Sequence, residues 1–453
     1  MIALSNKGVC SPSNIASTVI LLLLNNIGIH PLKPLICLRH AYAGRIQLER
    51  ARAATTITAA AFSPCGSFLV CASDSGRLAV WELSQHMASP GEDLCDTTPD
   101  MSWRADGSCI NCLCFAGDLL LCGGDESLFG CSWAEIVSAL ERGAMPPRSL
   151  NSFSPGTGGG GDEVLRVRCP VGMTTRASAR LPEINGISFD ETTKRVLCAA
   201  GDGNAYEWDL ESLTAANGNV PGGGGVVDRN GGGVLVRSYE GRKGYLHAVA
   251  GAPGSSLVAT GSDDGFVGIW DKRVKSTGGA NVAFLKPAHA QTGDGKESSP
   301  RGRGKPDLAE CVTSLEMDGG NNTLVCGGRR TGGAVVAGGI LEPTVGRGWV
   351  NQWSLTDLKA TNVASLPAEV QCMCSTGQGQ TLLTAGAEST VTYLSRNQLE
   401  RKNRTPVTTS SVYALAINGT GPYEGVTCVA GVGPVVELHS SPGGASPCSL
   451  RFA

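Results

Sequence analysis

The sequence predicts an all-β protein made of small antiparallel sheets that repeat along the chain. Glycine contributes 62 and proline 23 of the 453 residues, so the chain turns often and leaves little room for long helices. From residue 57 onward, short strands in which apolar and polar residues alternate recur with turns of glycine and aspartate between them. Charged residues make up only 17%, which excludes a long charged disordered chain. These features also exclude an α-helical bundle.

The repeated unit has a fixed order of parts. An alternating apolar strand, a turn, a short strand of small residues and a second turn precede a strand that ends in tryptophan or another bulky residue. The fourth unit is the most regular, and in its second turn Asp264 can cap the backbone while Gly265 tolerates a positive φ. We count seven units, at residues 57–83, 109–135, 184–210, 246–271, 312–353, 370–394 and 412–438.

Packing explains why such units stack around an axis. One small sheet cannot bury both of its faces alone, whereas radial stacking buries them and places the closing tryptophan in the wedge between sheets. Closing residues such as Trp270-Asp271 are typical of WD repeats. The sequence therefore predicts a seven-bladed WD40-type β-propeller with Gly-rich loop insertions over residues 45–453. The segments between units then supply the fourth strand of each blade.

Several units depart from the usual WD pattern. Gly241-Arg242 stands where a Gly-His dipeptide is usual, so the buried His–Asp–Ser–Trp hydrogen-bond chain is incomplete even in the fourth unit. Units six and seven end at Leu394 and Leu438 without tryptophan, and Trp133 in unit two is displaced by one or two positions. These departures predict a divergent propeller.

The insertions and the chain ends lie outside the repeat. We expect flexible insertions at about 144–180, 214–244, 274–309 and 329–347, because glycine-rich tracts or basic clusters interrupt the pattern in these segments. The last outer strand of the ring is predicted at Cys448–Phe452, with Arg45–Glu49 as the alternative.

Residues 1–44 have a different composition. Their apolar run, Val19–Leu24, is much shorter than the ~20 residues that span a membrane. Lys7 and the Ala41-Tyr42-Ala43 triplet leave a signal or transit peptide as an alternative, although the run lies far from that triplet. We interpret this segment as a disordered extension or a wrongly assigned start of the reading frame.

The 18 cysteines fall mostly in short apolar runs, where a free thiol acts as a small buried hydrophobe. We therefore expect a reducing compartment. The spacing of Cys109, Cys112 and Cys114 resembles a fragment of a zinc or redox site. No second pair follows at ligand spacing and the segment reads as a strand, so a structural role is favoured. We predict no metal and no cofactor.

Signatures of catalysis are missing from the sequence. It has no HxH, HExxH or GxSxG pattern and no Walker or dinucleotide-binding loop, so no catalytic residues and no enzyme are predicted. His247 lies in an apolar strand and Asp263-Asp264 in a repeat turn, which favours structural roles. The net charge of −3 gives no strong attraction to nucleic acid or to an anionic membrane. A small basic cluster (Arg301, Arg303 and Lys305) is the one candidate for RNA contact, and a solvated loop explains it better.

Landmarks along residues 55–453 resemble, in the same order, those of the THO complex subunit 6 family of WD-repeat proteins. The most distinctive are Trp133-Ala134-Glu135 after unit two and Pro182-Glu183-Ile184-Asn185 before unit three. The others are Ser63–Gly66, Gly201-Asp202, Asp209–Glu211, Tyr245–His247, Ser262–Asp271, Val325–Gly328, Ala385–Glu388 and Cys448–Phe452. The resemblance implies a nuclear scaffold subunit of the THO/TREX assembly, which couples transcription and processing to mRNA export. It implies other THO subunits as partners, with RNA contacted mainly through the complex.

A second interpretation concerns the end of unit four. Trp270-Asp271-Lys272-Arg273 resembles the W-D-x-R box of propellers that dock on the cullin-4 ubiquitin ligase adaptor. We therefore predict Asp264, Trp270, Asp271 and Arg273 as partner-binding residues, with Arg273 reaching an acidic partner. An ordinary blade end, in which a basic residue simply follows the W-D pair, remains the alternative explanation.

Overall fold

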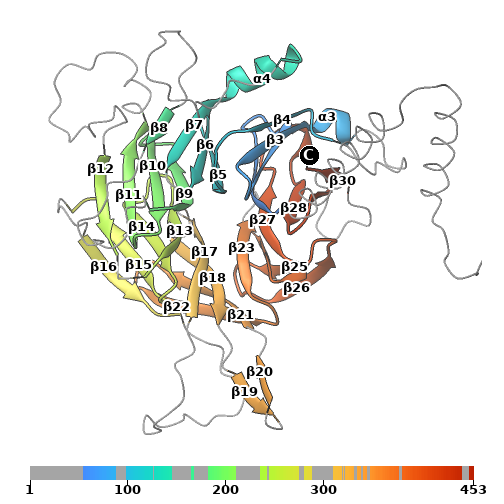
Figure 1. Cartoon of the computed structure of the whole chain (residues 1–453). Helices are drawn as coiled ribbons and strands as arrows, with labels where there is room; N and C mark the ends of the chain where they lie inside the picture. The colour runs from blue at the N-terminus through green and yellow to red at the C-terminus, as the bar shows by residue number, and fades with distance from the viewer. Residues whose placement is uncertain are drawn as a thin grey trace, which may run out of the picture. The chain divides into compact units, whose positions relative to one another are not determined.

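The computed structural model describes residues 55–87, 98–125, 127–144, 165–167, 182–210, 235–241, 244–274, 280–287, 310–318, 320, 322–330, 334–337, 340–343, 347–376, 380–440 and 448–452. The chain divides into Met1–Ala54 and Thr55–Ala453, and all described residues lie in the second unit. In this unit seven four-stranded antiparallel sheets surround a central axis (Figure 1). The predicted all-β, seven-bladed propeller is confirmed.

Each blade is a run of four strands whose order in the sheet follows the chain. The first three blades consist of β1 (Ile57–Phe62), β2 (Phe68–Ser73), β3 (Arg77–Glu82) and β4 (Met101–Arg104); β5 (Ile110–Ala116), β6 (Leu119–Gly124), β7 (Leu128–Ser132) and β8 (Leu165–Val167); and β9 (Ile184–Asp190), β10 (Arg195–Ala200), β11 (Asn204–Asp209) and β12 (Leu235–Glu240).

The remaining four blades are built in the same way. They consist of β13 (Leu246–Gly251), β14 (Leu257–Ser262), β15 (Val267–Asp271) and β16 (Ala280–Leu285); β17 (Glu310–Asp318), β18 (Thr323–Arg330), β21 (Arg347–Ser354) and β22 (Lys359–Leu366); β23 (Val370–Ser375), β24 (Thr381–Gly386), β25 (Glu388–Ser395) and β26 (Arg401–Pro406); and β27 (Val412–Ile417), β28 (Thr427–Gly431), β29 (Val435–His439) and β30 (Cys448–Arg451).

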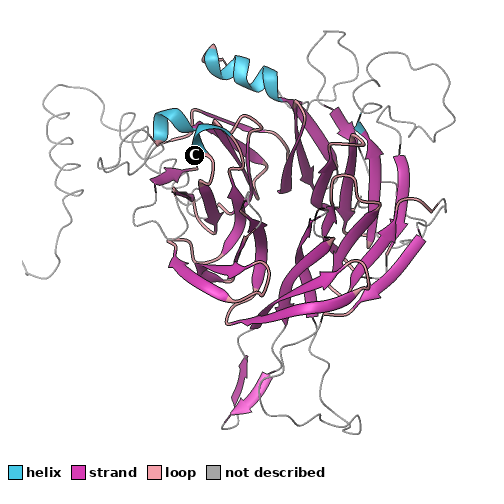
Figure 2. Ribbon diagram, turned by 180° about the vertical axis from the view of Figure 1, so that it is seen from behind, coloured by secondary structure: helices cyan, strands magenta, loops and turns pink. Residues whose placement is uncertain are grey.

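Few residues of the described part lie in other elements (Figure 2). The short helix α3 (Leu83–His86) follows β3, α4 (Trp133–Glu141) follows β7, and a 3-10 turn covers Gly421–Tyr423. Between β18 and β21 the chain forms a separate hairpin of β19 (Ala334–Ala337) and β20 (Ile340–Pro343).

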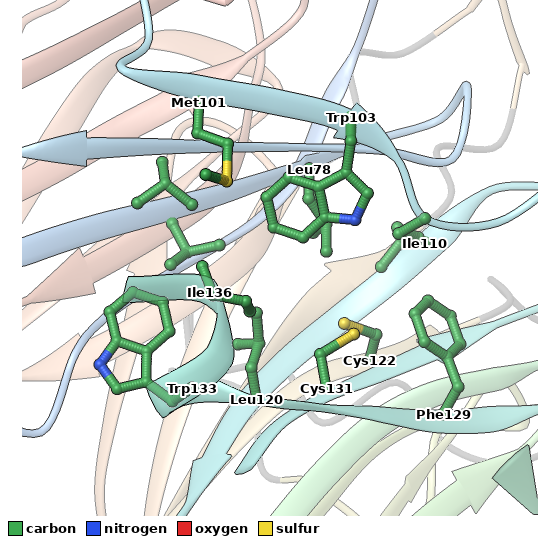
Figure 3. Packing of buried hydrophobic residues seen from close by; sticks show 14 of the residues in the cluster. Leu78, Met101, Trp103, Ile110, Leu120, Cys122, Phe129, Cys131, Trp133 and Ile136 are labelled. Carbon is green, nitrogen blue, oxygen red and sulfur yellow. The ribbon is translucent and has the colours of Figure 1, made fainter. Parts of the chain in front are cut away.

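The first strands of neighbouring blades contact one another around the axis, so the fourth strands form the outer edge. Each of the seven buried apolar clusters found in the described residues joins two adjacent blades. Figure 3 shows the cluster between blades one and two, where Met101 and Trp103 of β4 meet residues of the second blade. Burial between blades, rather than within one sheet, therefore stabilises the ring.

The closing tryptophans fill the wedges as predicted. Trp81, Trp208, Trp270 and Trp353 are buried, and each packs against the preceding blade. In blade two, Cys131 pairs with Leu120 at the tryptophan position, and Trp133 lies two residues later at the start of α4. Trp133 still packs into the cluster between blades one and two (Figure 3).

The register of blade seven corrects one expectation. We predicted Leu438 as the closing residue, but the pairing of β28 with β29 places His439 at the position that tryptophan holds elsewhere. Leu438 lies on the same face of the strand as Val436, and both pack toward blade one. His439 is buried and its Nε2 lies 3.2 Å from Glu437 Oε2.

The ring closes between two complete sheets. β30 pairs with β29, so the C-terminal segment supplies the last outer strand, and Arg45–Glu49 lies outside the described residues. Across the seam, Asn418 Nδ2 donates to the Gly66 carbonyl at 2.7 Å and Thr420 Oγ1 donates to the Pro64 carbonyl at 2.9 Å. A buried apolar cluster shared by blades one and seven completes the closure.

The four predicted insertions contain strand residues. β8, β12, β16 and the β19–β20 hairpin lie in the segments 144–180, 214–244, 274–309 and 329–347, respectively. Three of these elements are the outer strands of their blades, as the placement of the fourth strand between units predicted. The rest of the glycine-rich tracts and the basic cluster of Arg301, Arg303 and Lys305 lie outside the described residues.

Candidate partner-binding surfaces

The structure does not bring the four predicted partner-binding residues together at one surface. Asp264 precedes β15 and Arg273 follows it, so they lie at opposite ends of this strand. We call the side that carries the turns between second and third strands the Asp264 face, and the opposite side the Arg273 face. A strand of this length separates the two faces by roughly 15 Å.

Asp264 stabilises a tight turn. Its Oδ1 accepts a hydrogen bond from the Phe266 amide at 3.0 Å, and its own amide donates to Ser262 Oγ at 3.3 Å. Gly265 has a φ of +78°, a conformation that glycine adopts without strain. The geometry agrees with the turn-capping role that the repeat predicts for Asp264.

Trp270 supports the blade from inside. Its side chain is 1% exposed, and its Nε1 donates to Thr260 Oγ1 at 3.0 Å. The indole also contacts the rings of Tyr239 and Phe284, at centroid distances of 5.9 and 5.8 Å. A partner cannot reach Trp270 while the blade is folded. The acceptor is Thr260 of β14 rather than the serine of the usual chain, and sequence reasoning missed this residue.

Asp271 and Arg273 form a two-pronged ion pair. Arg273 Nε donates to Asp271 Oδ1 at 3.0 Å and Nη2 donates to Oδ2 at 2.6 Å, while the Arg273 amide donates to Oδ1 at 2.9 Å. The hydrogen bonds from Arg273 lower the pKa of the Asp271 carboxyl. The Arg273 side chain is 75% exposed, so the pair holds its guanidinium at the surface.

The same turn is attached to blade three. Lys272 Nζ donates to Asp190 Oδ2 at 3.1 Å, and Arg237 Nη1 donates to the Lys272 carbonyl at 2.5 Å. The pKa of Asp190 is lowered because the hydrogen bonds from Lys272 and Thr193 outweigh the effect of burial. These contacts fix the backbone beneath Arg273, so the cation is presented on a rigid support.

An open hollow adjoins Arg273 on this face. Its volume is about 410 Å³, and it lies between the turn that connects β13 to β14 and the start of β18. Serine and asparagine side chains and backbone groups contribute to its wall, which is lined by Pro253, Gly254, Ser255, Ser256, Leu257, Arg273 and Asn322. A cation beside small polar groups suits a carboxylate of a partner protein.

The first strands tie neighbouring blades together around the axis. Each contains a register shift at its second or fourth residue, and the residue at the shift is often polar. Thr58 Oγ1 donates to the Ile110 carbonyl, Asn185 Nδ2 to the Leu246 carbonyl at 2.8 Å, and Thr313 Oγ1 to the Val370 carbonyl at 2.6 Å. These side chains therefore bridge adjacent blades.

His247 occupies this position in blade four. Its ring lies 5.0 Å from the ring of Tyr245, and burial lowers the pKa of the imidazole. A neutral, partly buried ring packed on a tyrosine fits the structural role that the sequence suggested.

The cysteines of the described part are all free thiols. Burial raises the pKa of Cys109 to about 12 and that of Cys114 to about 11, and it also raises the pKa of Cys112. Thiols with raised pKa values bind metals poorly. Among the described residues, no group of three or more histidine, cysteine, aspartate and glutamate side chains is arranged to hold a metal ion.

Four cysteines have a specific place in the repeat. They lie in second strands, and each pairs with the first strand of its own blade at the position that Thr260 holds in blade four. These cysteines are Cys71, Cys122, Cys198 and Cys326. In blades one and three the closing indoles, Trp81 and Trp208, have no hydrogen-bond acceptor for Nε1. Comparison of the small-residue strands in the seven units could have shown from the sequence that cysteine stands in four of them where unit four has threonine.

None of the helices in the part of the chain that the structure describes has the length and apolar character needed to cross a membrane. The family model described as "WD domain, G-beta repeat" matches residues 49–82, which include β1–β3 of blade one, and residues 233–271, which include β12 of blade three and β13–β15 of blade four. With seven four-stranded sheets around one axis, the chain is a WD-repeat β-propeller.

The chain is also similar to curated proteins that are named as THO complex subunit 6. The chain is 26% identical to THO complex subunit 6 of Arabidopsis thaliana over 408 residues, which cover 85% of this chain and 87% of the relative. It is 25% identical to THO complex subunit 6 of Homo sapiens and 26% identical to the Rattus norvegicus homolog, in each case over 48% of this chain and 51% of the relative. The alignments thus span about half the length of the two mammalian proteins. The predicted resemblance to the THO complex subunit 6 family is confirmed.

Proposed function

We propose that the chain is a non-catalytic scaffold subunit of a nuclear THO complex, and that it supports mRNA processing and export through protein–protein contacts. The observation that carries this proposal is the similarity to the Arabidopsis THO complex subunit 6, which extends along most of both chains. An alignment of 408 residues is much longer than one blade, so the resemblance is not confined to one repeat.

The structure supports a binding role in physical terms. The buried clusters between blades and the bridges between first strands make the ring rigid, so its surface residues keep fixed relative positions. A partner that binds such a surface pays little entropy for ordering it. The net charge of −3 favours protein partners over direct binding of the RNA backbone, so RNA is contacted mainly through the complex.

Affinity purification tests the proposal directly. The tagged full chain would be isolated from nuclear extract after nuclease treatment, and its partners identified by mass spectrometry. We expect the other THO subunits to be recovered in stoichiometric amounts without RNA. Recovery of no THO subunit by a chain with an intact β-sheet circular dichroism spectrum would contradict the proposal.

We also infer a second candidate function, a substrate receptor of a cullin-4 ubiquitin ligase. The specific observation in its favour is the exposed Arg273, which Asp271 holds beside the hollow on the Arg273 face. Arg273→Glu should remove co-purification of the cullin-4 adaptor and leave THO assembly intact. Lys402→Glu on blade six, an exposed cation on another outer strand, is the matched control. Retention of the adaptor by the Arg273 variant would reject this function.

A further inference from the structure

The outer strand of blade four exposes apolar side chains. Val282 and Phe284 of β16 are 48% and 37% exposed, and Val274 in the preceding turn is 43% exposed. β16 forms the outer edge of its blade (Figure 1), where it pairs with β15 on one side and with no other described strand. Strand edges of this kind accept a further strand readily unless charge protects them.

Other outer strands do carry such protection. The exposed residues of β26 are mainly Arg401, Lys402 and Asn403, and β22 begins with exposed Lys359. Among fourth strands whose side chains are described, only β16 exposes large apolar residues. The difference is local to one blade and is not a general property of the ring.

The contrast is sharpest at one equivalent position. In blades three to six, a register shift beside the closing residue of the third strand skips one residue of the outer strand. That residue is the exposed Val282 in blade four, a half-buried Val236 in blade three, Thr361 in blade five and Lys402 in blade six. The fold therefore accepts a lysine here, and the valine in blade four is not required for the sheet to form.

Phe284 is already ordered for contact. Its ring meets the Trp270 indole edge to face, with centroids 5.8 Å apart, and Trp270 is itself held by Thr260. A partner that covers Phe284 loses little side-chain entropy on the propeller side. The side-chain Nδ2 of Asn281 donates to the Ala283 carbonyl at 3.2 Å, so one backbone acceptor of β16 is partly satisfied by the strand itself.

Exposed cations stand at both ends of the strand. Arg273 precedes β16 and Lys286 follows it, and both are exposed. The Asp271 carboxylate is already bound by Arg273. If two copies of this chain paired through antiparallel β16 strands, Arg273 of one would approach Lys286 of the other, and like charges repel. The charges therefore favour a different, acidic partner.

We propose that β16 is a docking strand for an extended segment of another protein, in which apolar residues alternate and acidic residues flank them. The apolar side chains of the segment cover Val282 and Phe284, and its carboxylates meet Arg273 and Lys286. Burial of apolar area supplies the affinity, and the flanking charges set the direction and the choice of partner. The inference goes beyond the proposed function and does not depend on membership of a THO complex.

Selection from a peptide library tests the proposal. Random 12-residue peptides displayed on phage would be selected on the immobilised full chain, after depletion on the Val282→Lys variant. We expect enriched peptides with alternating apolar residues and terminal Asp or Glu. By fluorescence anisotropy, an enriched peptide should bind Val282→Lys at least tenfold more weakly than the unmodified chain. The peptide should also bind the Arg273→Glu/Lys286→Glu variant more weakly than the unmodified chain. This difference in affinity should become smaller at high salt.

A matched variant separates this effect from unfolding. Thr361→Lys makes the same change at the equivalent position of blade five, and it should leave the affinity within twofold of the unmodified chain. The proposal is overturned if no peptide discriminates Val282→Lys, if the enriched peptides are basic, or if Thr361→Lys weakens binding equally. It is also overturned if sedimentation equilibrium finds a dimer that Val282→Lys converts to a monomer, because a second copy would then cover β16.

Discussion

Removing the hydroxyl group of Thr260 should destabilise blade four through its buried tryptophan. Trp270 is 1% exposed and its Nε1 donates only to Thr260 Oγ1, at 3.0 Å. Thr260→Val keeps the shape of the side chain but leaves a buried N–H group without an acceptor. Such a group costs about 1–3 kcal/mol, and the added methyl group offsets part of this. We expect the free energy of unfolding to fall by about 1–2 kcal/mol.

Two further variants isolate the hydrogen bond. Thr260→Cys places a sulfur atom, a weak acceptor, at the position that Cys71, Cys198 and Cys326 hold in other blades, and should cost less than about 1 kcal/mol. Thr384→Val is the control in blade six, where the equivalent threonine pairs with Thr392 and donates to its carbonyl at 3.4 Å, and the closing residue is Leu394 instead of an indole that needs an acceptor.

Urea unfolding measures these differences, followed by tryptophan fluorescence and circular dichroism after reversibility has been established. A double-mutant cycle with Trp270→Phe should give a coupling energy of about 1 kcal/mol. If Thr260→Val costs no more than Thr384→Val, or if the coupling is zero, then the hydrogen bond does not stabilise the blade and the reasoning fails.

Three other perturbations test the seam and two titrating groups. Gly66→Ala should cost at least about 3 kcal/mol, because φ is +71° and a Cβ would lie 2.0 Å from a backbone oxygen of blade seven. Gly117→Ala, at φ +59° in open space, should cost only about 1 kcal/mol, and equal urea midpoints for the two variants would contradict this. Burial opposes ionisation of Glu437, but hydrogen bonds from its neighbours outweigh it and lower the pKa of the carboxyl. Its stabilising effect is therefore present above the unfolded-state pKa of about 4.3 and is lost as pH falls, so Glu437→Gln should show a shallower loss of stability below that pH. Burial lowers the pKa of His247, so the unfolded chain takes up its proton first. The unmodified chain should lose stability below about pH 6.5, and a His247→Gln variant with an identical pH profile would argue against this contribution.

The architecture could be predicted from the sequence because the signal is local. Apolar and polar residues alternate within each short strand, and turns separate the strands, so each unit forms a sheet with two faces to bury. Stacking the seven sheets around one axis buries both faces of each. The tryptophan wedge followed from the same argument, since a large side chain at the end of a third strand must lie between blades. Trp81, Trp208 and Trp270 all lie there.

The details that escaped prediction depend on register and on contacts between distant segments. His439 rather than Leu438 closes blade seven, because a shift of one residue moves a side chain to the other face of a strand. The outer strand β16 lies in a segment that the sequence marked as an insertion. Its two exposed apolar residues are too few to stand out beside the glycine-rich tracts that follow.

The candidate site was predicted less well than the fold, and strand geometry explains why. We grouped Asp264 with Arg273 because they are close in sequence. However, β15 runs from one face of the ring to the other and separates the two residues. Trp270 and Asp271 are buried and serve the blade and its turn, whereas Asp264 is half-buried and Arg273 is exposed. A sequence motif that extends along one strand therefore includes residues on both faces of the ring and residues in its interior.

Arg273 takes part in two of the proposals, and Val282 separates them. A ligase adaptor that recognises the W-D-x-R box needs the guanidinium on the Arg273 face, and nothing in that geometry requires an apolar residue on the outer strand. A peptide that pairs with β16 needs both. Arg273→Glu should therefore weaken either interaction, whereas Val282→Lys should weaken only the second. If both variants abolish recovery of the cullin-4 adaptor while THO subunits remain bound, then the adaptor itself binds along β16, and the two surfaces are one.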